Sequence, residues 1–344
     1  MYEAFYGLSS RPFDLSPDPR YLVQTEIHHE ALSNLEHAIA TRKGITLLVG
    51  EAGTGKTTII RAAIEKPRKK VHCVYLHNPA LTRGEFVRML ARQFELSADA
   101  HNSKTDLLFE LERLLSERQR QNETTLIVID EAQCLPSELL DEVRLLTNIE
   151  TSSDKLLLLI IAGQPEIAER LNEPAFRQLK QRIALRCELR PLRLDESAKY
   201  IAGRIQSADG RPSHVFTREA VAVVHEHARG IPRVINVIAD NALLTGFAEQ
   251  QKPVRTDIVR RVCRDFDIST GATSPSVRQP TDRRPSEMSL TASEREMINA
   301  GMSAYTDLAR RRSLPTSTAT ADDPRVGIRE IAQSLTTKKD IQRI

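Results

Sequence analysis

Ile45-Thr-Leu-Leu-Val-Gly50-Glu-Ala-Gly-Thr-Gly55-Lys56-Thr57 is the stretch of sequence that decides the fold. Its first five residues form an apolar run that predicts a buried strand. The next eight have the spacing Gly-x4-Gly-Lys-Thr, and a helical pattern follows them. Glycines let a loop wrap closely round a phosphate group, and the backbone N–H groups of the loop and of the helix start face its oxygens. The context on both sides predicts a phosphate-binding loop rather than a chance glycine-rich turn.

The residue types inside this loop predict a nucleotide triphosphate with a metal ion. Lys56 is expected to reach the β- and γ-phosphates, and the Thr57 hydroxyl is expected to ligate Mg²⁺. ATP and Mg²⁺ are therefore the predicted ligands. The residues predicted to contact the nucleotide are Gly50, Glu51, Ala52, Gly53, Thr54, Gly55, Lys56, Thr57 and Thr58.

The first half of the chain alternates short apolar runs with amphipathic stretches. The apolar runs are residues 45–49, 71–76, 125–130, 156–162 and 184–189, and the helical patterns between them are residues 57–65, 83–94, 104–121 and 137–149. Parallel strands need such crossovers, because each strand must return to the same edge of the sheet. We predict an α/β domain with a parallel five-stranded sheet and helices on both faces.

Polar side chains follow two of these strands. Asp130 and Glu131 come at the end of an apolar run about 70 residues after the phosphate loop. We predict that Asp130 holds Mg²⁺, directly or through water, and that Glu131 is the general base for the attacking water. Gln164 follows the next run, where it would contact the γ-phosphate or its water; the alternative is a plain turn residue before Pro165.

The second half of the chain has a different pattern. Residues 195–206, 217–228, 232–250 and 256–266 read as helices, which predicts a small all-helical second domain. After residue 268 the sequence is rich in Ser, Thr, Pro and Arg, a composition typical of disorder. Residues 291–312 and 325–344 are either short partner-binding helices or segments of a weakly structured tail. The predicted domains are 1–193, 194–268 and 269–344.

The order of motifs resembles that of AAA+ ATPases. The phosphate loop is followed by DEAQ at 130–133, GQPE at 163–166, LKQRI at 179–183 and GIPRVIN at 230–236. More narrowly, the order looks like that of the ExeA/GspA-type secretion ATPases, whose relatives include transposition ATPases of the TnsC/TniB kind. Residues 5–22 are also similar to the start of the secretion-type group.

The resemblance implies roles for three polar residues and an oligomer. Gln164 takes the place of sensor 1, and Arg233 in GIPR takes that of sensor 2, in a helical lid. Arg182 matches an arginine finger donated to a neighbouring subunit, with Arg177 as a less favoured substitute. The alternative for Arg182 is a surface ion pair. A planar, permanently charged guanidinium suits both sensor 2 and the finger, because each neutralises charge that spreads over phosphoryl oxygens.

Three functions agree with these motifs. The first is an oligomeric ATPase that assembles or remodels a partner complex, of secretion, export or pilus type. The second is a DNA-dependent ATPase of the transposition type, with residues 61–70 or the arginines at 310–312 on phosphates; a solvated face is the alternative for these charges. The third is a slow, nucleotide-gated scaffold, against which Glu131 argues.

Composition sets further limits on the function. The 49 basic and 46 acidic residues give a net charge of only +3, so charge alone does not indicate nucleic acid. Cys73, Cys134, Cys187 and Cys263 are too far apart for a metal cluster or a disulfide framework, and we expect them to be small buried hydrophobes.

The sequence also predicts a cytoplasmic protein that reaches a membrane only through a partner. It has no secretory signal pattern, and its longest apolar run, residues 156–162, is far shorter than the roughly 20 residues that span a bilayer. ExeA-type proteins commonly continue into a membrane span and a peptidoglycan-binding domain. The polar tail seen here instead puts a direct cell-wall role in doubt.

Overall fold

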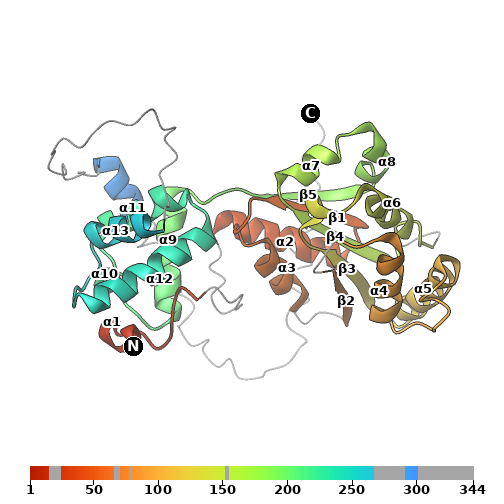
Figure 1. Ribbon diagram of the computed structural model, residues 1–344, viewed down its shortest axis with the longest axis horizontal. Coiled ribbons are helices and arrows are strands. Elements are labelled where there is room, and N and C mark those ends of the chain that lie inside the picture. The colour runs from red at the N-terminus through yellow and green to blue at the C-terminus, as the bar shows by residue number, and fades with distance from the viewer. Residues whose placement is uncertain (15–24, 66–69, 77–79, 152–154, 267–290, 301–344) are drawn as a thin grey trace, which may run out of the picture. The chain divides into compact units, whose positions relative to one another are not determined.

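A five-stranded parallel sheet carries the phosphate loop. The computed structural model describes residues 1–14, 25–65, 70–76, 80–151, 155–266 and 291–300. The strands are β1 (Ile45–Gly50), β2 (Val71–Leu76), β3 (Thr124–Ile129), β4 (Leu157–Gly163) and β5 (Ile183–Leu189). They lie in the order β2-β3-β4-β1-β5, and every neighbouring pair is parallel (Figure 1). The predicted α/β sheet is confirmed.

Helices cover both faces of this sheet because alternate strand residues point to opposite sides. On one face, Leu47, Ile127 and Leu159 pack in a core with α4 (Arg83–Gln93), α5 (Lys104–Arg120) and α6 (Ser137–Leu146). On the other, Leu48, Val128 and Ile160 pack against α2 (Glu26–Ala40) and α3 (Lys56–Glu65). All residues of β1, β3 and β4 are buried, which explains why these strands read as continuous apolar runs.

The strand order brings three loops together at one edge of the sheet. β4 pairs with β3 on one side and with β1 on the other, and the carboxyl ends of parallel strands meet at the same edge. The phosphate loop after β1, the carboxylates after β3 and the polar turn after β4 therefore lie side by side. Three short elements that the sequence did not predict follow β4: α7 (Pro165–Arg170), η3 (Pro174–Phe176) and α8 (Arg177–Lys180).

The helical region of the chain has a core of its own. Its helices are α9 (Leu194–Ser207), α10 (Pro212–Val215), α11 (Arg218–Ala228), α12 (Pro232–Ala248) and α13 (Thr256–Asp265). The four longer ones correspond to the four predicted helices. Their buried residues, such as Ile201, Val224 and Ile238, form one continuous cluster.

The amino-terminal residues belong to this helical core, whereas our domain prediction grouped them with the sheet. Tyr2 and Tyr6, on α1 (Tyr2–Tyr6), and Phe13 are almost fully buried in the cluster. The buried guanidinium of Arg204 on α9 donates hydrogen bonds to the carbonyls of Pro12 and Asp14. Spacing along the sequence cannot reveal such a packing partner, because it is nearly 200 residues away.

A segment of the predicted tail also joins the helical core. Residues 292–300 are helical, and Ile298 is fully buried in the same cluster as α9 to α13. This agrees with the amino-terminal portion of the helix predicted over 291–312. Residues 267–290 and 301–344, including the second predicted helix at 325–344, lie outside the described residues.

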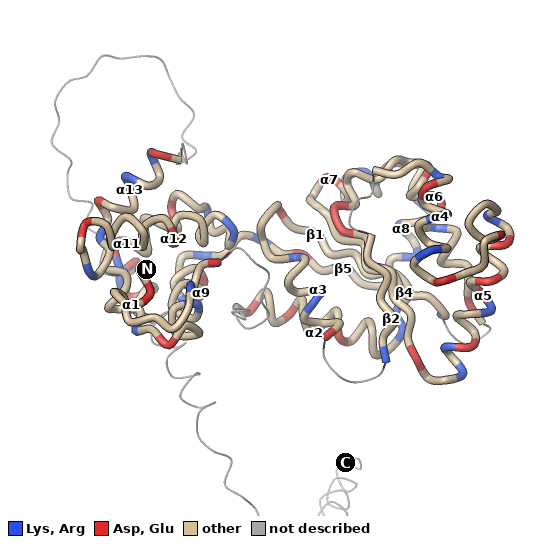
Figure 2. The backbone as a smooth tube through the Cα atoms, turned by 60° about the horizontal axis from the view of Figure 1, so that its bottom comes forward, with Lys and Arg blue, Asp and Glu red and all other residues tan. Residues whose placement is uncertain are grey.

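The sequence predictions about the cysteines, the distribution of charge and membrane-spanning segments can be compared with the structure. Cys187 and Cys263 are buried as expected, but Cys73 on the edge strand β2 and Cys134 in the turn after β3 are exposed, so the prediction was wrong for those two. Basic and acidic residues are interspersed along the described backbone (Figure 2), in line with the balanced charge. Among the described residues, no helix combines the length and apolar character needed to cross a bilayer.

Candidate functional site

The phosphate loop forms the turn from β1 into α3. Gly53 and Gly55 have φ values of +82° and +98°, which only glycine adopts without strain, so the loop requires glycine at these two positions. Thr54 is buried, and its Oγ1 donates to the carbonyl of Glu51 at 2.8 Å. Glu51 and Ala52 are exposed at the loop tip, and Thr58 lies in the first turn of α3.

Lys56 is buried at the start of α3, and its ammonium group lies against the loop itself. Nζ donates to the carbonyl of Gly50 at 2.7 Å and to that of Glu51 at 3.0 Å. Burial lowers the pKa of Lys56, while the negative charges of Glu131, Asp130 and Glu166 oppose that shift. The ammonium group is therefore held by two loop carbonyls and lies in the electrostatic field of three carboxylates.

Thr57 and Asp130 meet although 73 residues separate them. The Thr57 Oγ1 donates to Asp130 Oδ2 at 2.6 Å, and Asp130 Oδ1 accepts from the backbone N–H of Glu131 at 3.0 Å. A hydroxyl beside a carboxylate offers the oxygen ligands that Mg²⁺ prefers, and Mg²⁺ usually takes few ligands from protein. The donor set fits this ion. In the described residues, no group of three or more His, Cys, Asp or Glu side chains forms a metal cluster.

Glu131 lies beside Gln133 and the end of β4. It adopts a left-handed backbone conformation with φ 52°, which for a non-glycine residue costs about 1–3 kcal/mol. Its Oε2 accepts from Gln133 Nε2 at 2.6 Å, and Gln133 Oε1 accepts from the backbone N–H of Gln164 at 3.1 Å. The structure thus brings Glu131 and Gln164 together through Gln133, a residue to which the sequence analysis gave no role.

Arg170 fixes the loop that carries these residues. From α7, its Nη1 donates to the carbonyl of Gln133 at 2.9 Å and to that of Leu135 at 2.8 Å. The guanidinium also lies over the ring of Phe176. Arg170 was not predicted either, because nothing in the sequence pairs it with a loop about 35 residues upstream.

The helical region of the chain contacts the phosphate loop at Arg233. Its backbone N–H donates to the carbonyl of Gly53 at 3.2 Å, and a Cβ on Gly53 would approach Arg233 Cβ to 2.7 Å. The Arg233 side chain is exposed and makes no hydrogen bond or ion pair with any described residue. The predicted sensor 2 residue therefore lies next to the loop, and its guanidinium has no polar partner among the described residues.

Arg182 is exposed just before β5 and contacts α6. Its Nη1 donates to the carbonyl of Arg144 at 3.1 Å and to Thr147 Oγ1 at 2.5 Å, at the carboxyl end of that helix. Both contacts are hydrogen bonds to uncharged oxygens, so they are not the surface ion pair that was the alternative expectation for Arg182. Arg177 is also exposed, without a side-chain hydrogen bond or ion pair to the described residues. Among the described residues, neither arginine makes a hydrogen bond or ion pair with the phosphate loop.

His28 is a further residue at the site that the sequence analysis missed. It is buried on α2, with Nε2 3.1 Å from the carbonyl of Thr54 and Nδ1 2.9 Å from Thr25 Oγ1. Since a carbonyl only accepts, Nε2 carries the proton. Burial lowers the pKa of His28. A lone histidine has no sequence signal for such a contact.

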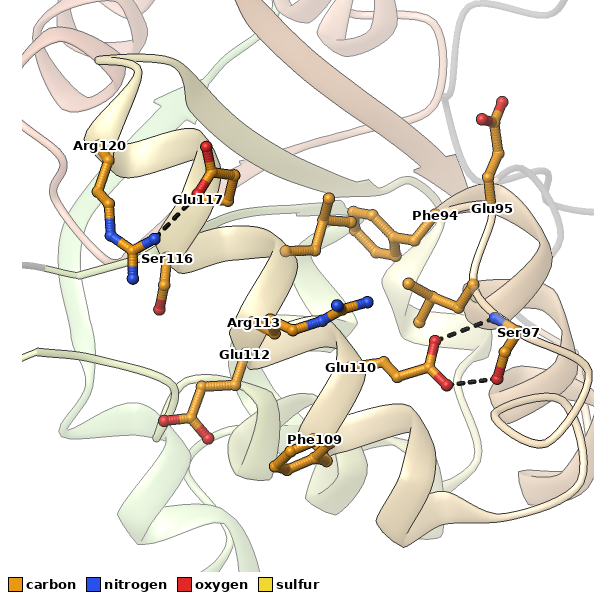
Figure 3. A pocket seen from close by; sticks show the side chains of 12 residues that line it. Phe94, Glu95, Ser97, Phe109, Glu110, Glu112, Arg113, Ser116, Glu117 and Arg120 are labelled. Atoms are coloured by element: carbon orange, nitrogen blue, oxygen red, sulfur yellow. Dashed lines mark hydrogen bonds and ion pairs between the residues drawn. The ribbon is translucent and has the colours of Figure 1, made fainter.

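A separate hollow lies between the end of α4 and α5, with a volume of about 900 Å³. Figure 3 shows Glu110 of α5 bonded across it to Ser97, and Arg113 of the same helix extending into it. None of its lining residues is a predicted site residue, so it has no part in the nucleotide site.

Known proteins resemble this chain in sequence. Residues 39–171 match the family model described as an AAA domain. The chain is 39% identical over 260 residues to general secretion pathway protein A of Aeromonas hydrophila, and the match covers 75% of this chain and 47% of that protein. The matched part of the chain is an AAA+ domain of the ExeA/GspA type. The chain spans about half the length of this curated relative.

Two solved structures have a fold similar to that of this chain. The ORC2 protein of Aeropyrum pernix, solved as ADPNP–ADP complexes, has a TM-score of 0.57 at 16% identity, covering 75% of this chain and 72% of its own. Cdc6p of Pyrobaculum aerophilum has a TM-score of 0.53 at 16% identity, covering 74% and 70%. At such identity the likeness is one of fold alone.

The predictions about DNA remain predictions. Residues 66–69 and 310–312, which hold most of the proposed basic contacts, lie outside the described residues. Of the described ones, Lys70 pairs with Glu123 at 3.0 Å.

Proposed function

We propose that this AAA+ protein hydrolyses ATP with Mg²⁺ at the interface between identical subunits. The observation that carries the proposal is the meeting of Thr57, Asp130 and Glu131 beside the phosphate loop, with Gln164 on the adjoining turn. These side chains come from three different stretches of the sequence. A fold that needed only to bind nucleotide would not require a carboxylate next to the one that accepts from Thr57.

In this proposal each residue of the site has a separate role in hydrolysis. Backbone N–H groups of residues 50–55 and the Lys56 ammonium group hold the phosphates, and Thr57 and Asp130 would hold Mg²⁺, which neutralises charge on the phosphate oxygens. The Glu131 carboxylate takes a proton from the attacking water. Gln164 orients that water or the γ-phosphate, and Arg233 contacts the nucleotide from the helical region of the chain.

A neighbouring subunit would complete the site through Arg182. The residue is exposed, and its described contacts are with α6 rather than with its own phosphate loop. A guanidinium placed on the γ-phosphate stabilises the charge of the transition state, by about 10³–10⁵ in rate in P-loop enzymes that use such a finger. The protein would therefore act as a homo-oligomer, with Arg177 as the substitute for Arg182.

The hydrolysis cycle would assemble or remodel a partner complex of the secretion or export type. This rests on the similarity to general secretion pathway protein A, of which the chain spans 47%. We place the protein in the cytoplasm, with any membrane reached through that partner. A slow nucleotide-gated scaffold is less favoured, because Glu131 is present and lies beside Asp130.

Substitution of Glu131 by Gln tests the assignment of the base. We expect Glu131→Gln to lower the ATP turnover number by about 100-fold or more, since the amide cannot accept the proton. Binding of a fluorescent ATP analogue with Mg²⁺ should remain, because Lys56, Thr57 and Asp130 are intact. The exposed Glu138→Gln, on α6, is the matched control and should keep turnover. Wild-type turnover in Glu131→Gln would show that the base has been assigned wrongly.

A further inference from the structure

Gln133 connects the end of β3 to the end of β4 through its side-chain amide. The N–H side of the amide donates to Glu131 Oε2 at 2.6 Å, and the carbonyl side accepts from the backbone N–H of Gln164 at 3.1 Å. Both polar ends of one side chain are thus used, one on each of the two residues proposed to face the attacking water. Gln133 itself is half-buried in the turn η2 (Ala132–Cys134).

The surroundings of Gln133 hold this amide in one place. Arg170, on α7, donates to the backbone carbonyl of Gln133, which fixes the backbone at position 133. Gly163 leaves room for the side chain: a Cβ at that position would come within 2.8 Å of Gln133 Oε1. The helix α7 begins directly after Gln164 and ends at Arg170. This one short helix therefore helps to position both Gln164 and the backbone of Gln133.

The direction of the two hydrogen bonds leaves one orientation for the amide. A backbone N–H only donates, so the Gln133 atom facing Gln164 must be the carbonyl oxygen, and the amide nitrogen must then face Glu131. A carboxylate that accepts a hydrogen bond from a fixed N–H loses side-chain freedom, and its position becomes tied to that of the donor. A movement of the Gln164 peptide would therefore reach Glu131 through Gln133.

We propose that Gln133 is a positioning residue for hydrolysis, which holds the Glu131 carboxylate in register with the Gln164 turn. The inference rests on the proposed function, in which Glu131 is the base. Gln133 touches neither nucleotide nor water in this account; it acts through Glu131. Loss of the connection leaves the base in place but free to rotate away from the direction of attack.

Gln133→Leu in the full chain is the main test, because Leu keeps most of the volume and makes neither hydrogen bond. We expect the turnover number for ATP to fall about 10- to 100-fold, as for losses of residues that orient a reacting group. The KM for ATP and the affinity for a fluorescent ATP analogue should stay at the wild-type values. The exposed Gln93→Leu at the end of α4 is the matched control and should change none of these quantities.

Two more variants separate positioning from a general structural role. Gln133→Glu keeps an acceptor for the Gln164 N–H but has no N–H for Glu131, so its turnover should fall as far as that of Gln133→Leu. Gly163→Ala leaves Gln133 unchanged but places a Cβ 2.8 Å from its Oε1 and 3.0 Å from Ile167 Cγ2, so it should lower turnover with ATP affinity retained. Combined with Gln133→Leu, it should cause little additional loss.

The double variant Glu131→Gln/Gln133→Leu decides whether Gln133 acts through the base. We expect it to turn over ATP at the rate of Glu131→Gln alone, because the second change has nothing left to act on. A further loss by the full factor, a parallel loss of ATP affinity in Gln133→Leu, or wild-type turnover in Gln133→Leu would each overturn the inference. If instead Glu131→Gln alone keeps wild-type turnover, the proposed function fails first, which distinguishes the two failures.

Discussion

Single residues at this site are held by bonds to backbone carbonyls and to one another. Lys56 donates to the loop carbonyls, Thr57 to Asp130, and His28 to the carbonyl of Thr54. Each hydrogen bond fixes the position of a group that must be in a set place for nucleotide to bind. His28 differs from the other two because its charge can change near neutral pH.

The buried His28 should make stability fall as the pH decreases. Burial lowers its pKa in the folded chain below the usual 6.5. Below pH 6.5 the unfolded chain takes up a proton at this position that the folded chain does not, so the free energy of unfolding decreases from about pH 6.5 down to the lowered pKa. We expect His28→Gln, which can still donate to Thr54, to flatten this dependence in urea unfolding measured between about pH 5 and pH 7.

Two other histidines set the controls for that measurement. Burial also lowers the pKa of His225, so the His28→Gln variant should keep some of the slope. The neighbouring exposed His29→Gln should keep the whole of it. An identical slope in His28→Gln and in the wild type would contradict the account of His28.

At the scale of elements, a tight turn positions the residue that contacts the phosphate loop. Gly230, in the turn between α11 and α12, has φ +73°, and a Cβ there would come within 2.0 Å of the Leu192 carbonyl oxygen, in the segment before α9. The Gly230 carbonyl accepts from the Leu192 N–H at 2.8 Å. This turn leads directly to Arg233, which bonds to Gly53 in the phosphate loop.

Gly230→Ala should therefore destabilise the chain and weaken nucleotide binding together. We expect a loss of at least about 2 kcal/mol in the free energy of unfolding, because both the left-handed φ and the contact with Leu192 are incompatible with a Cβ. Gly84→Ala is the matched control: it lies in α4, where a Cβ would meet only Arg88 at 3.6 Å, and should be neutral or stabilising by up to about 1 kcal/mol. Equal effects of the two substitutions, in thermal or urea unfolding, would contradict this reading of the turn.

The sequence predicts local elements and motif positions well, and long-range contacts poorly. The alternating apolar runs predict all five strands, and the motif spacing places the residues of the phosphate loop, Asp130 and Gln164 at one edge of the sheet. By contrast, the contact of Gln133 with Glu131, that of Arg170 with the loop after β3 and that of His28 with Thr54 depend on the folded chain. Periodicity carries no information about which side chain a polar group will meet.

For the whole molecule, we propose that two subunits share one active site. The phosphate loop, Asp130, Glu131 and Gln164 come together within one chain, whereas exposed Arg182 and Arg177 have no described contact with that loop. Tyr2, Phe13 and Ile298 are buried with α9 to α13, so the helical region is a single packed unit. In our proposal this unit carries Arg233 to the nucleotide.

Mixing two inactive variants tests this claim most directly. Glu131→Gln removes the base and Arg182→Ala removes the arginine, so each variant alone should turn over ATP far below the wild-type rate. In an equimolar mixture, an interface can combine the intact base of one variant with the intact arginine of the other. We expect ATP turnover to recover to about a quarter of the wild-type rate, the share of such interfaces in random head-to-tail assembly. A mixture as inactive as its two components, or full activity in Arg182→Ala alone, would contradict the account.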